Sequence, residues 1–175
     1  LATGRESGGS GRPPGSTFKT FALAEAVREG YSIRSVLQSP TNLEISEPQC
    51  TNGGDVWKVR GGPGGASSLV TATKNSINTV FAQLMVRLGP QAVADLAMDM
   101  GVSSLADQQV QCSWVLGSGE VSVMDMAAAY STLANEGVAK SPIVVTRVEF
   151  PDGSVRTYEA TEKQVLTPEQ AARVT

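Results

Sequence analysis

The chain has 175 residues, and 41% of them are hydrophobic, which is enough to build the core of one domain or of a large piece of one. It carries 14 Lys and Arg residues against 17 Asp and Glu residues, a net charge of −3. A nucleic-acid-binding protein is expected to carry an excess of basic residues, so this class is disfavoured. The sequence contains no histidine, which excludes a Ser-His-Asp triad, a Cys-His pair and a His-ligated zinc site. Any general base must therefore be Lys, Asp, Glu or Tyr.

The first third of the chain alternates between flexible and helical patterns. Residues 1–15 are dominated by glycine, serine and proline and predict a flexible, linker-like lead-in. An apolar stripe that includes Phe18 and Phe21 predicts a helix over residues 16–29, which ends at Gly30. Residues 38–67 contain several glycines and three prolines, so we expect a long ordered loop here rather than packed elements.

The rest of the chain predicts further helices and one hairpin. Helical patterns cover residues 68–88, which end at Gly89-Pro90, and residues 91–100. Residues 122–125 resemble a capping box that opens an alanine-rich helix through residue 135. Residues 143–158 read as two β-branched runs around a turn and predict a β-hairpin, and Thr167 is the N-cap of a last helix.

Ser16 and Lys19 are the first candidates for chemistry. Three positions apart at a helix start, they lie on one face about one turn apart. In a chain without histidine, a partly buried lysine can take the proton of a serine nucleophile. The alternative is that Ser16 is only an N-cap.

Ser76 and Asn78 are a second pair of polar residues inside an otherwise apolar stretch. On a continuous helix, two residues at this spacing point to opposite sides and would be solvated. If the helix breaks between them, both can face one cleft. Spacing alone leaves both alternatives open.

Cys50 and Cys112 are the only cysteines, and their separation fits neither a redox motif nor a metal site. They are either two unrelated thiols or a disulfide, and the second requires an oxidising compartment.

Two of these motifs carry a resemblance to a known family. Residues 14–21, Pro-Gly-Ser-Thr-Phe-Lys-Thr-Phe, resemble the nucleophile motif of penicillin-binding proteins, and residues 74–79, Lys-Asn-Ser-Ile-Asn-Thr, resemble their Ser-x-Asn motif. Residues 116–135 resemble the segment that follows in the bifunctional class A members. Together these stretches extend the resemblance over about residues 12–175.

The resemblance implies an α+β protein with the serine DD-transpeptidase or β-lactamase-like fold, in which helices flank an antiparallel sheet. It implies that Ser16 attacks a peptidoglycan stem peptide, that Lys19 accepts the serine proton, and that Ser76 and Asn78 relay protons and orient substrate. With this resemblance we predict a break at residues 76–78 that turns both side chains toward the start of the Ser16 helix. β-Lactams would acylate the same serine, without a metal or cofactor. We expect Trp57 either to line the cleft or to cover apolar loop surface.

The same resemblance places the protein on the extracytoplasmic face of the bacterial membrane, where oxidising conditions would join Cys50 to Cys112. The family's third motif, Lys-Thr-Gly, is absent from the sequence. We therefore expect residues 1–175 to be a partial transpeptidase domain, mainly its helical lobe plus a β-hairpin, which the remaining strands of the same domain complete. Two alternatives remain open: a β-lactamase or β-lactam sensor, and a non-catalytic helical module that binds peptidoglycan or a partner protein.

Overall fold

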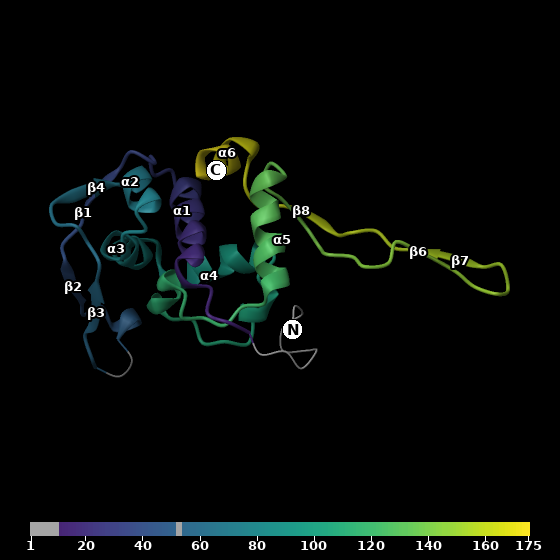
Figure 1. Ribbon diagram of the computed structural model, residues 1–175, viewed down its shortest axis with the longest axis horizontal. Coiled ribbons are helices and arrows are strands. Elements are labelled where there is room, and N and C mark those ends of the chain that lie inside the picture. The colour runs from purple at the N-terminus through teal and green to yellow at the C-terminus, as the bar shows by residue number, and fades with distance from the viewer. Residues whose placement is uncertain (1–10, 52–53) are drawn as a thin grey trace.

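The computed structural model describes residues 11–51 and 54–175, and helix α1 (Lys19–Arg28) lies at the centre of its helical body. Eight of the ten residues of α1 are buried, and the helix packs against α3 (Asn78–Leu88), α4 (Pro90–Asp99) and α6 (Pro168–Val174). Figure 1 shows α1 between α3 and α5 (Val123–Ala134). Three alanines in α1 permit this close packing. The predicted helix at residues 16–29 is confirmed, although its first turn is a 3-10 helix, η2 (Gly15–Phe18).

The helical stretch at residues 68–88 is broken where the sequence predicted. Helix α2 (Leu69–Lys74) ends, and α3 begins at Asn78. The Ile77 N–H donates to the Ala72 carbonyl (2.9 Å) and the Ser76 N–H donates to the Thr73 carbonyl (3.1 Å). These two bonds form a Schellman motif, which satisfies the last carbonyls of α2 and reverses the chain.

The prediction of a loop without packed elements at residues 38–67 is wrong. The segment belongs to a β-ribbon in which β1 (Val36–Gln38) pairs with β4 (Ala66–Ser68), and β2 (Asn42–Ile45) pairs with β3 (Trp57–Arg60), all antiparallel. The prolines and glycines lie between these short strands and bend the ribbon. Gly62 lies between β3 and β4, where the backbone passes close to its neighbours. A side chain does not fit there, because a Cβ atom would overlap the Pro40 carbonyl and the Thr79 side chain.

Helix α5 begins at a side-chain cap, although not with the full capping box that the sequence suggested. The Ser122 Oγ accepts from the Asp125 N–H (3.0 Å), but the Asp125 carboxylate accepts from the Ser104 N–H (2.7 Å) instead of reaching back to Ser122. The N-cap is therefore confirmed, and the reciprocal half of the box is wrong because Ser104 offers a competing donor. Helix α6 does have a complete capping box, between Thr167 and Gln170.

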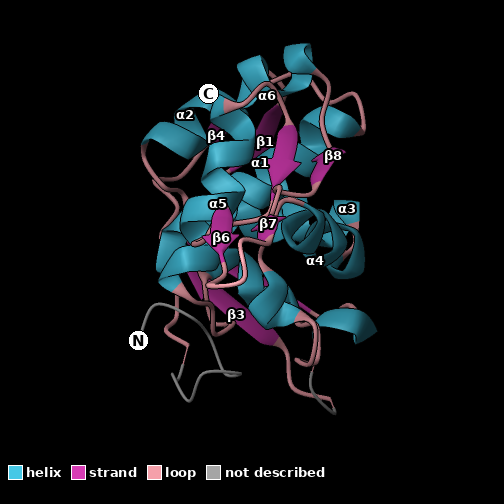
Figure 2. Cartoon of the chain, turned by 90° about the vertical axis from the view of Figure 1, so that its right-hand side faces the viewer, coloured by secondary structure: helices cyan, strands magenta, loops and turns pink. Residues whose placement is uncertain are grey.

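The predicted hairpin is confirmed and forms an arm that projects from the helical body (Figure 1). β5 (Val138–Lys140) pairs with β8 (Glu162–Gln164) next to the body, and β6 (Arg147–Glu149) pairs with β7 (Val155–Thr157) farther out. Figure 2 looks along this arm and shows helices making up most of the body behind it.

The fold class is α+β, as predicted, but the described residues contain four two-stranded sheets rather than a single hairpin. Three short 3-10 helices complete the body: η3 (Pro48–Cys50), η4 (Ser103–Leu105) and η5 (Cys112–Leu116). Most of the predicted lead-in, residues 1–10, lies outside the described residues; its described end is held by an antiparallel bridge between Arg12 and Val121. None of the helices in the described ranges is long and apolar enough to cross a membrane.

Candidate active site

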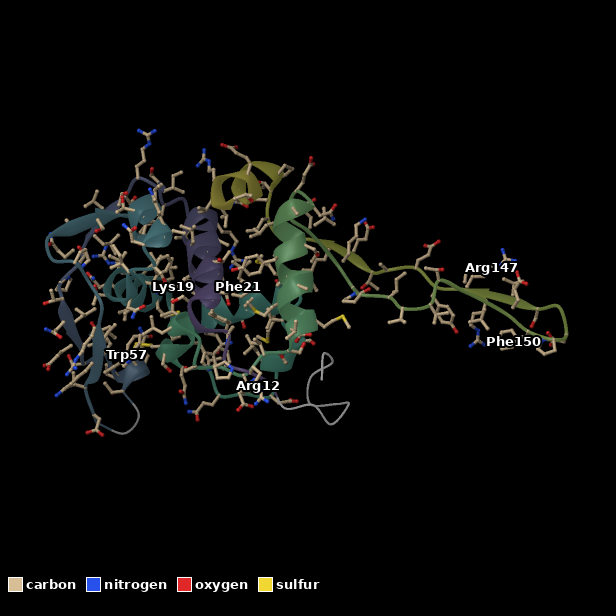
Figure 3. The ribbon with its side chains drawn as sticks, in the orientation of Figure 1. Arg12, Lys19, Phe21, Trp57, Arg147 and Phe150 are labelled. Carbon is tan, nitrogen blue, oxygen red and sulfur yellow. A yellow bond between two sulfur atoms is a disulfide. The ribbon has the colours of Figure 1, made fainter. Side chains whose placement is uncertain are left out.

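The structure brings together the four candidate residues around one amine, the Nζ atom of Lys19. This atom lies 3.1 Å from Ser16 Oγ, 2.9 Å from Ser76 Oγ and 2.6 Å from Asn78 Oδ1. Lys19 is only 4% exposed, and Figure 3 places it inside the body, at the start of α1. Two motifs about 60 residues apart therefore meet at one point.

Ser16 lies at the surface, whereas Lys19 is buried one turn later. Ser16 belongs to the 3-10 turn η2, and Lys19 is the first residue of α1. The exposed hydroxyl is open to an approaching ligand, and the amine behind it is shielded from water. This is the arrangement that a serine nucleophile and its base require.

Ser76 occupies a backbone position that usually belongs to glycine. It is the residue after the C-cap of α2, and its φ is +53°, in the left-handed region. A non-glycine residue costs roughly 1–2 kcal/mol in this conformation. The turn directs two oxygen atoms of Ser76 at Lys19, because the Lys19 amine also donates to the Ser76 carbonyl (2.7 Å).

Asn78 is held at both ends of its amide group. Its Oδ1 accepts from Lys19, and its Nδ2 donates to the carbonyl of Arg60 at the end of β3 (3.1 Å). The carbonyl of Arg60 thus fixes which end of the amide faces the lysine. In this structure Asn78 orients the Lys19 amine; its expected contact with substrate stays a prediction.

Burial lowers the pKa of Lys19 from its ordinary value of 10.5 to about 8. Four oxygen atoms lie within hydrogen-bond distance of the amine, although an ammonium group has only three protons to donate. A neutral Lys19 donates two hydrogen bonds and has a lone pair for a third partner, and only a hydroxyl can fill that place as donor. The hydroxyls of Ser16 and Ser76 both meet this requirement, so the geometry permits a proton to pass from Ser16 to Lys19.

The cysteines form a disulfide, as predicted. The sulfur atoms of Cys50 and Cys112 are bonded, with Cα atoms 5.2 Å apart. The bond joins η3, beside the β-ribbon, to η5, which packs against α3 and η2. It thereby ties together two segments that flank the site.

Trp57 lies beside this disulfide rather than beside Lys19. Its half-buried indole lines a small cavity together with the two cysteines, Gln49 and Gln111. Figure 3 likewise shows Trp57 on the β-ribbon, apart from Lys19. Trp57 also packs against the buried cluster of Ile45, Val59 and Ala82, which fits the alternative in which it covers apolar surface, and a role in substrate binding stays a prediction.

Residues on two other segments contact the turn that carries Ser16, although they lie outside the Ser16 and Ser76 motifs. Tyr130 of α5 contacts the turn that carries Ser16, and Gly117 packs against Gly15. Both belong to the third stretch of family resemblance, but nothing in the sequence spacing shows what they touch. A lone tyrosine in an alanine-rich helix is the one local signal that could have pointed to Tyr130.

Comparison with known proteins agrees with this geometry. The protein is 34% identical over 168 residues to penicillin-binding protein 1A of Mycolicibacterium smegmatis and 32% identical to that of Mycobacterium tuberculosis, in each case over 88% of this chain and 20% of the relative. The solved structure of penicillin-binding protein PonA1 from Mycobacterium tuberculosis superposes with a TM-score of 0.79 at 32% identity, over 94% of this chain and 46% of that one. The chain thus spans about a fifth of the length of these curated relatives.

Residues 9–175 match the family described as the penicillin binding protein transpeptidase domain. This match covers nearly the whole chain and includes the Ser16 and Ser76 motifs. The chain belongs to the penicillin-binding protein transpeptidase domain family.

Proposed function

We propose that this chain carries the nucleophile and base of a serine DD-transpeptidase that cross-links peptidoglycan on the extracytoplasmic face of the bacterial membrane. The observation that carries the proposal is the 3.1 Å contact between the exposed Ser16 hydroxyl and the buried amine of Lys19. The relatives support it, because one solved neighbour at 31% identity is a complex of PonA1 with penicillin V.

In the proposed acylation step, neutral Lys19 takes the proton of Ser16 while Oγ attacks the carbonyl of the penultimate D-alanine of a stem peptide. The peptide C–N bond breaks, and terminal D-alanine leaves with a proton that Lys19 returns directly or through the Ser76 hydroxyl, which lies 2.9 Å from Nζ. Ser16 then carries the peptide as an ester.

In the transfer step, an amine of a neighbouring stem attacks this ester. Lys19 accepts a proton from the amine, the ester C–O bond breaks, and Ser16 Oγ regains a proton. A β-lactam would follow only the first half, because its opened ring stays attached to Ser16.

We further propose that the remaining strands of a transpeptidase domain complete the site with a second oxyanion donor and a group that binds the substrate carboxylate. This chain together with those strands, on the same polypeptide or added as a second one, is here called the completed domain. Losing one oxyanion donor typically costs about 10²–10³ in rate. Residues 1–175 alone should therefore react very slowly.

The test is covalent labelling of the completed domain with a fluorescent penicillin, followed by mass mapping of the modified peptide. We expect one adduct, on Ser16, that is lost in Ser16→Ala and kept in the control Ser131→Ala, an exposed serine on α5. Labelling that survives Ser16→Ala, or no labelling of the completed domain, would overturn the proposal. An adduct that hydrolyses within seconds would indicate a β-lactamase.

A further inference from the structure

We propose that Tyr130 is a positioning residue that holds Ser16 and Lys19 in register within one helical turn. The inference rests on the proposed function, since it concerns the same nucleophile and base. Tyr130 lies on α5, 110 to 113 positions from the residues that it contacts, and it touches neither Ser16 nor Lys19 through a hydrogen bond in the described structure.

The phenol bridges the two residues that directly follow the catalytic pair. Tyr130 Oη donates to the carbonyl of Thr17 (2.8 Å) and lies 2.8 Å from Thr20 Oγ1. A phenol has one proton, so when it donates to Thr17 the hydroxyl of Thr20 must be the donor to Tyr130. Thr17 follows Ser16 and Thr20 follows Lys19, so one oxygen atom connects both ends of the turn.

This turn needs support from outside because its own geometry is irregular. It starts as the 3-10 helix η2 and becomes α-helical at Lys19, and no side chain caps its N-terminus. A 3-10 turn has poorer hydrogen-bond geometry than an α-helix, so the distance from Ser16 to Lys19 is weakly fixed by the backbone alone.

The support comes from a rigid element. Helix α5 is capped by Ser122, and its Thr132 hydroxyl donates to the carbonyl of Met100 (3.0 Å), the C-cap residue of α4. The ring of Tyr130 packs edge-on against Phe21 of α1, with centroids 6.4 Å apart. The phenol oxygen is thus held in place by contacts that do not depend on its hydrogen bonds.

A second contact limits movement of the same turn. Gly117 lies so close to Gly15 that a Cβ atom on Gly117 would overlap the backbone N and O atoms of Gly15. Gly15 directly precedes Ser16. The turn is therefore held by Gly117 at its first residue and by Tyr130 at Thr17 and Thr20.

Tyr130 is 39% exposed, so the effect of its hydroxyl on the position of the turn can be measured apart from any effect on the stability of the fold. Water can satisfy the partners of an exposed phenol when it is removed, so its loss should scarcely change the melting temperature. The effect should instead fall on the chemical step, because small displacements of reacting groups reduce rate strongly.

The test compares Tyr130→Phe, which keeps the ring against Phe21, with the control Tyr158→Phe in the completed domain. Tyr158 is similarly exposed, at 42%, but lies on the arm. We expect Tyr130→Phe to lower the rate constant of acylation by penicillin roughly 10-fold, the equivalent of one lost hydrogen bond, with unchanged non-covalent affinity and melting temperature. Tyr158→Phe should match the wild type.

Two further measurements make the outcome decisive. Thr20→Val should slow acylation similarly, and the double variant should be no slower than either single one, because both remove the same bridge. The pKa of Lys19, followed by NMR, should rise toward 10.5 in Tyr130→Phe and in Thr20→Val but not in Tyr158→Phe, because a looser turn admits water to the amine.

An unchanged acylation rate together with an unchanged Lys19 pKa in Tyr130→Phe would overturn the inference. So would a loss of rate matched by an equal loss of stability. Failure of the proposed function gives a different pattern: the wild type is not acylated at Ser16, while the Lys19 pKa still responds to Tyr130→Phe.

Discussion

The amine of Lys19 donates to the backbone carbonyl of Ser76 (2.7 Å), and Ser76 holds the left-handed conformation that a glycine would adopt more easily. The two residues are 57 positions apart. The strained turn places both the carbonyl and the hydroxyl of Ser76 within hydrogen-bond distance of the Lys19 amine. The chain thus keeps an unfavourable backbone conformation at the point where two motifs meet, as functional sites often do.

This relationship predicts that two Ser76 substitutions have the same effect on activity but different effects on stability. Ser76→Ala and Ser76→Gly both remove the hydroxyl, so both should slow acylation. Only glycine relieves the left-handed strain, so Ser76→Gly should be more stable than Ser76→Ala by about 1–2 kcal/mol in urea unfolding of the completed domain. Equal stability of the two variants would show that the conformation costs nothing here.

The lowered pKa of Lys19 predicts how the rate of acylation depends on pH. Below a pKa of about 8 the amine is protonated and cannot accept the Ser16 proton, so the acylation rate should fall roughly tenfold per pH unit and level off above pH 8. Lys19→Arg keeps the charge but cannot lose its proton, and should be slower by roughly 10² or more at every pH. A flat profile for the wild type between pH 6 and 9 would show that Lys19 is not the base.

Removal of the Cys50–Cys112 disulfide should lower the free energy of unfolding substantially. The bond closes a loop of 62 positions, and the chain-entropy estimate for such a loop is about 4 kcal/mol. The double variant Cys50→Ala, Cys112→Ala should lose about this free energy of unfolding, measured in urea. A reducing agent should destabilise the wild type but leave the double variant unchanged; an equal effect on both would point to a cause other than the bond.

Glu25 is a buried carboxyl group in the middle of α1, 1% exposed, and burial raises its pKa although Arg28 opposes the shift. Arg28 Nη2 lies 2.8 Å from Oε2 and 2.9 Å from Oε1, but only Oε1 accepts a hydrogen bond. Because the folded state holds the proton more tightly than the unfolded state, stability should fall as pH rises above the ordinary glutamate pKa of 4.5.

Glu25→Gln removes the charge and should remove this slope. We expect the stability of Glu25→Gln relative to wild type to increase between pH 4 and pH 7.5, measured by urea unfolding of the completed domain. Glu47→Gln, at an exposed position, serves as the control and should show no such trend. A relative stability of Glu25→Gln that decreases with pH would mean that the ion pair with Arg28 outweighs burial.

Local patterns predicted the helices, because helix periodicity and the chemistry of helix ends are set by neighbouring residues, whereas the break at Ser76 was predicted only with the help of the family motifs. The strands of residues 36–68 were missed since each has only three or four residues and pairs across prolines and glycines that signal loops. Tyr130 and the Arg60 carbonyl could not be found this way, because their contacts depend on how distant elements pack. The convergence of Ser16, Lys19, Ser76 and Asn78 was predicted through the family motifs rather than through spacing alone.

The most direct test of the central claim, that Lys19 activates Ser16 for acyl transfer, uses a stem peptide ending in D-alanyl-D-alanine together with an acceptor amine. With the completed domain, we predict release of one D-alanine for each peptide attached to Ser16, and transfer of that peptide to the acceptor. Ser16→Ala should abolish both products and Ser131→Ala neither. Release of D-alanine that persists in Ser16→Ala, or its absence in the wild type, would contradict the account.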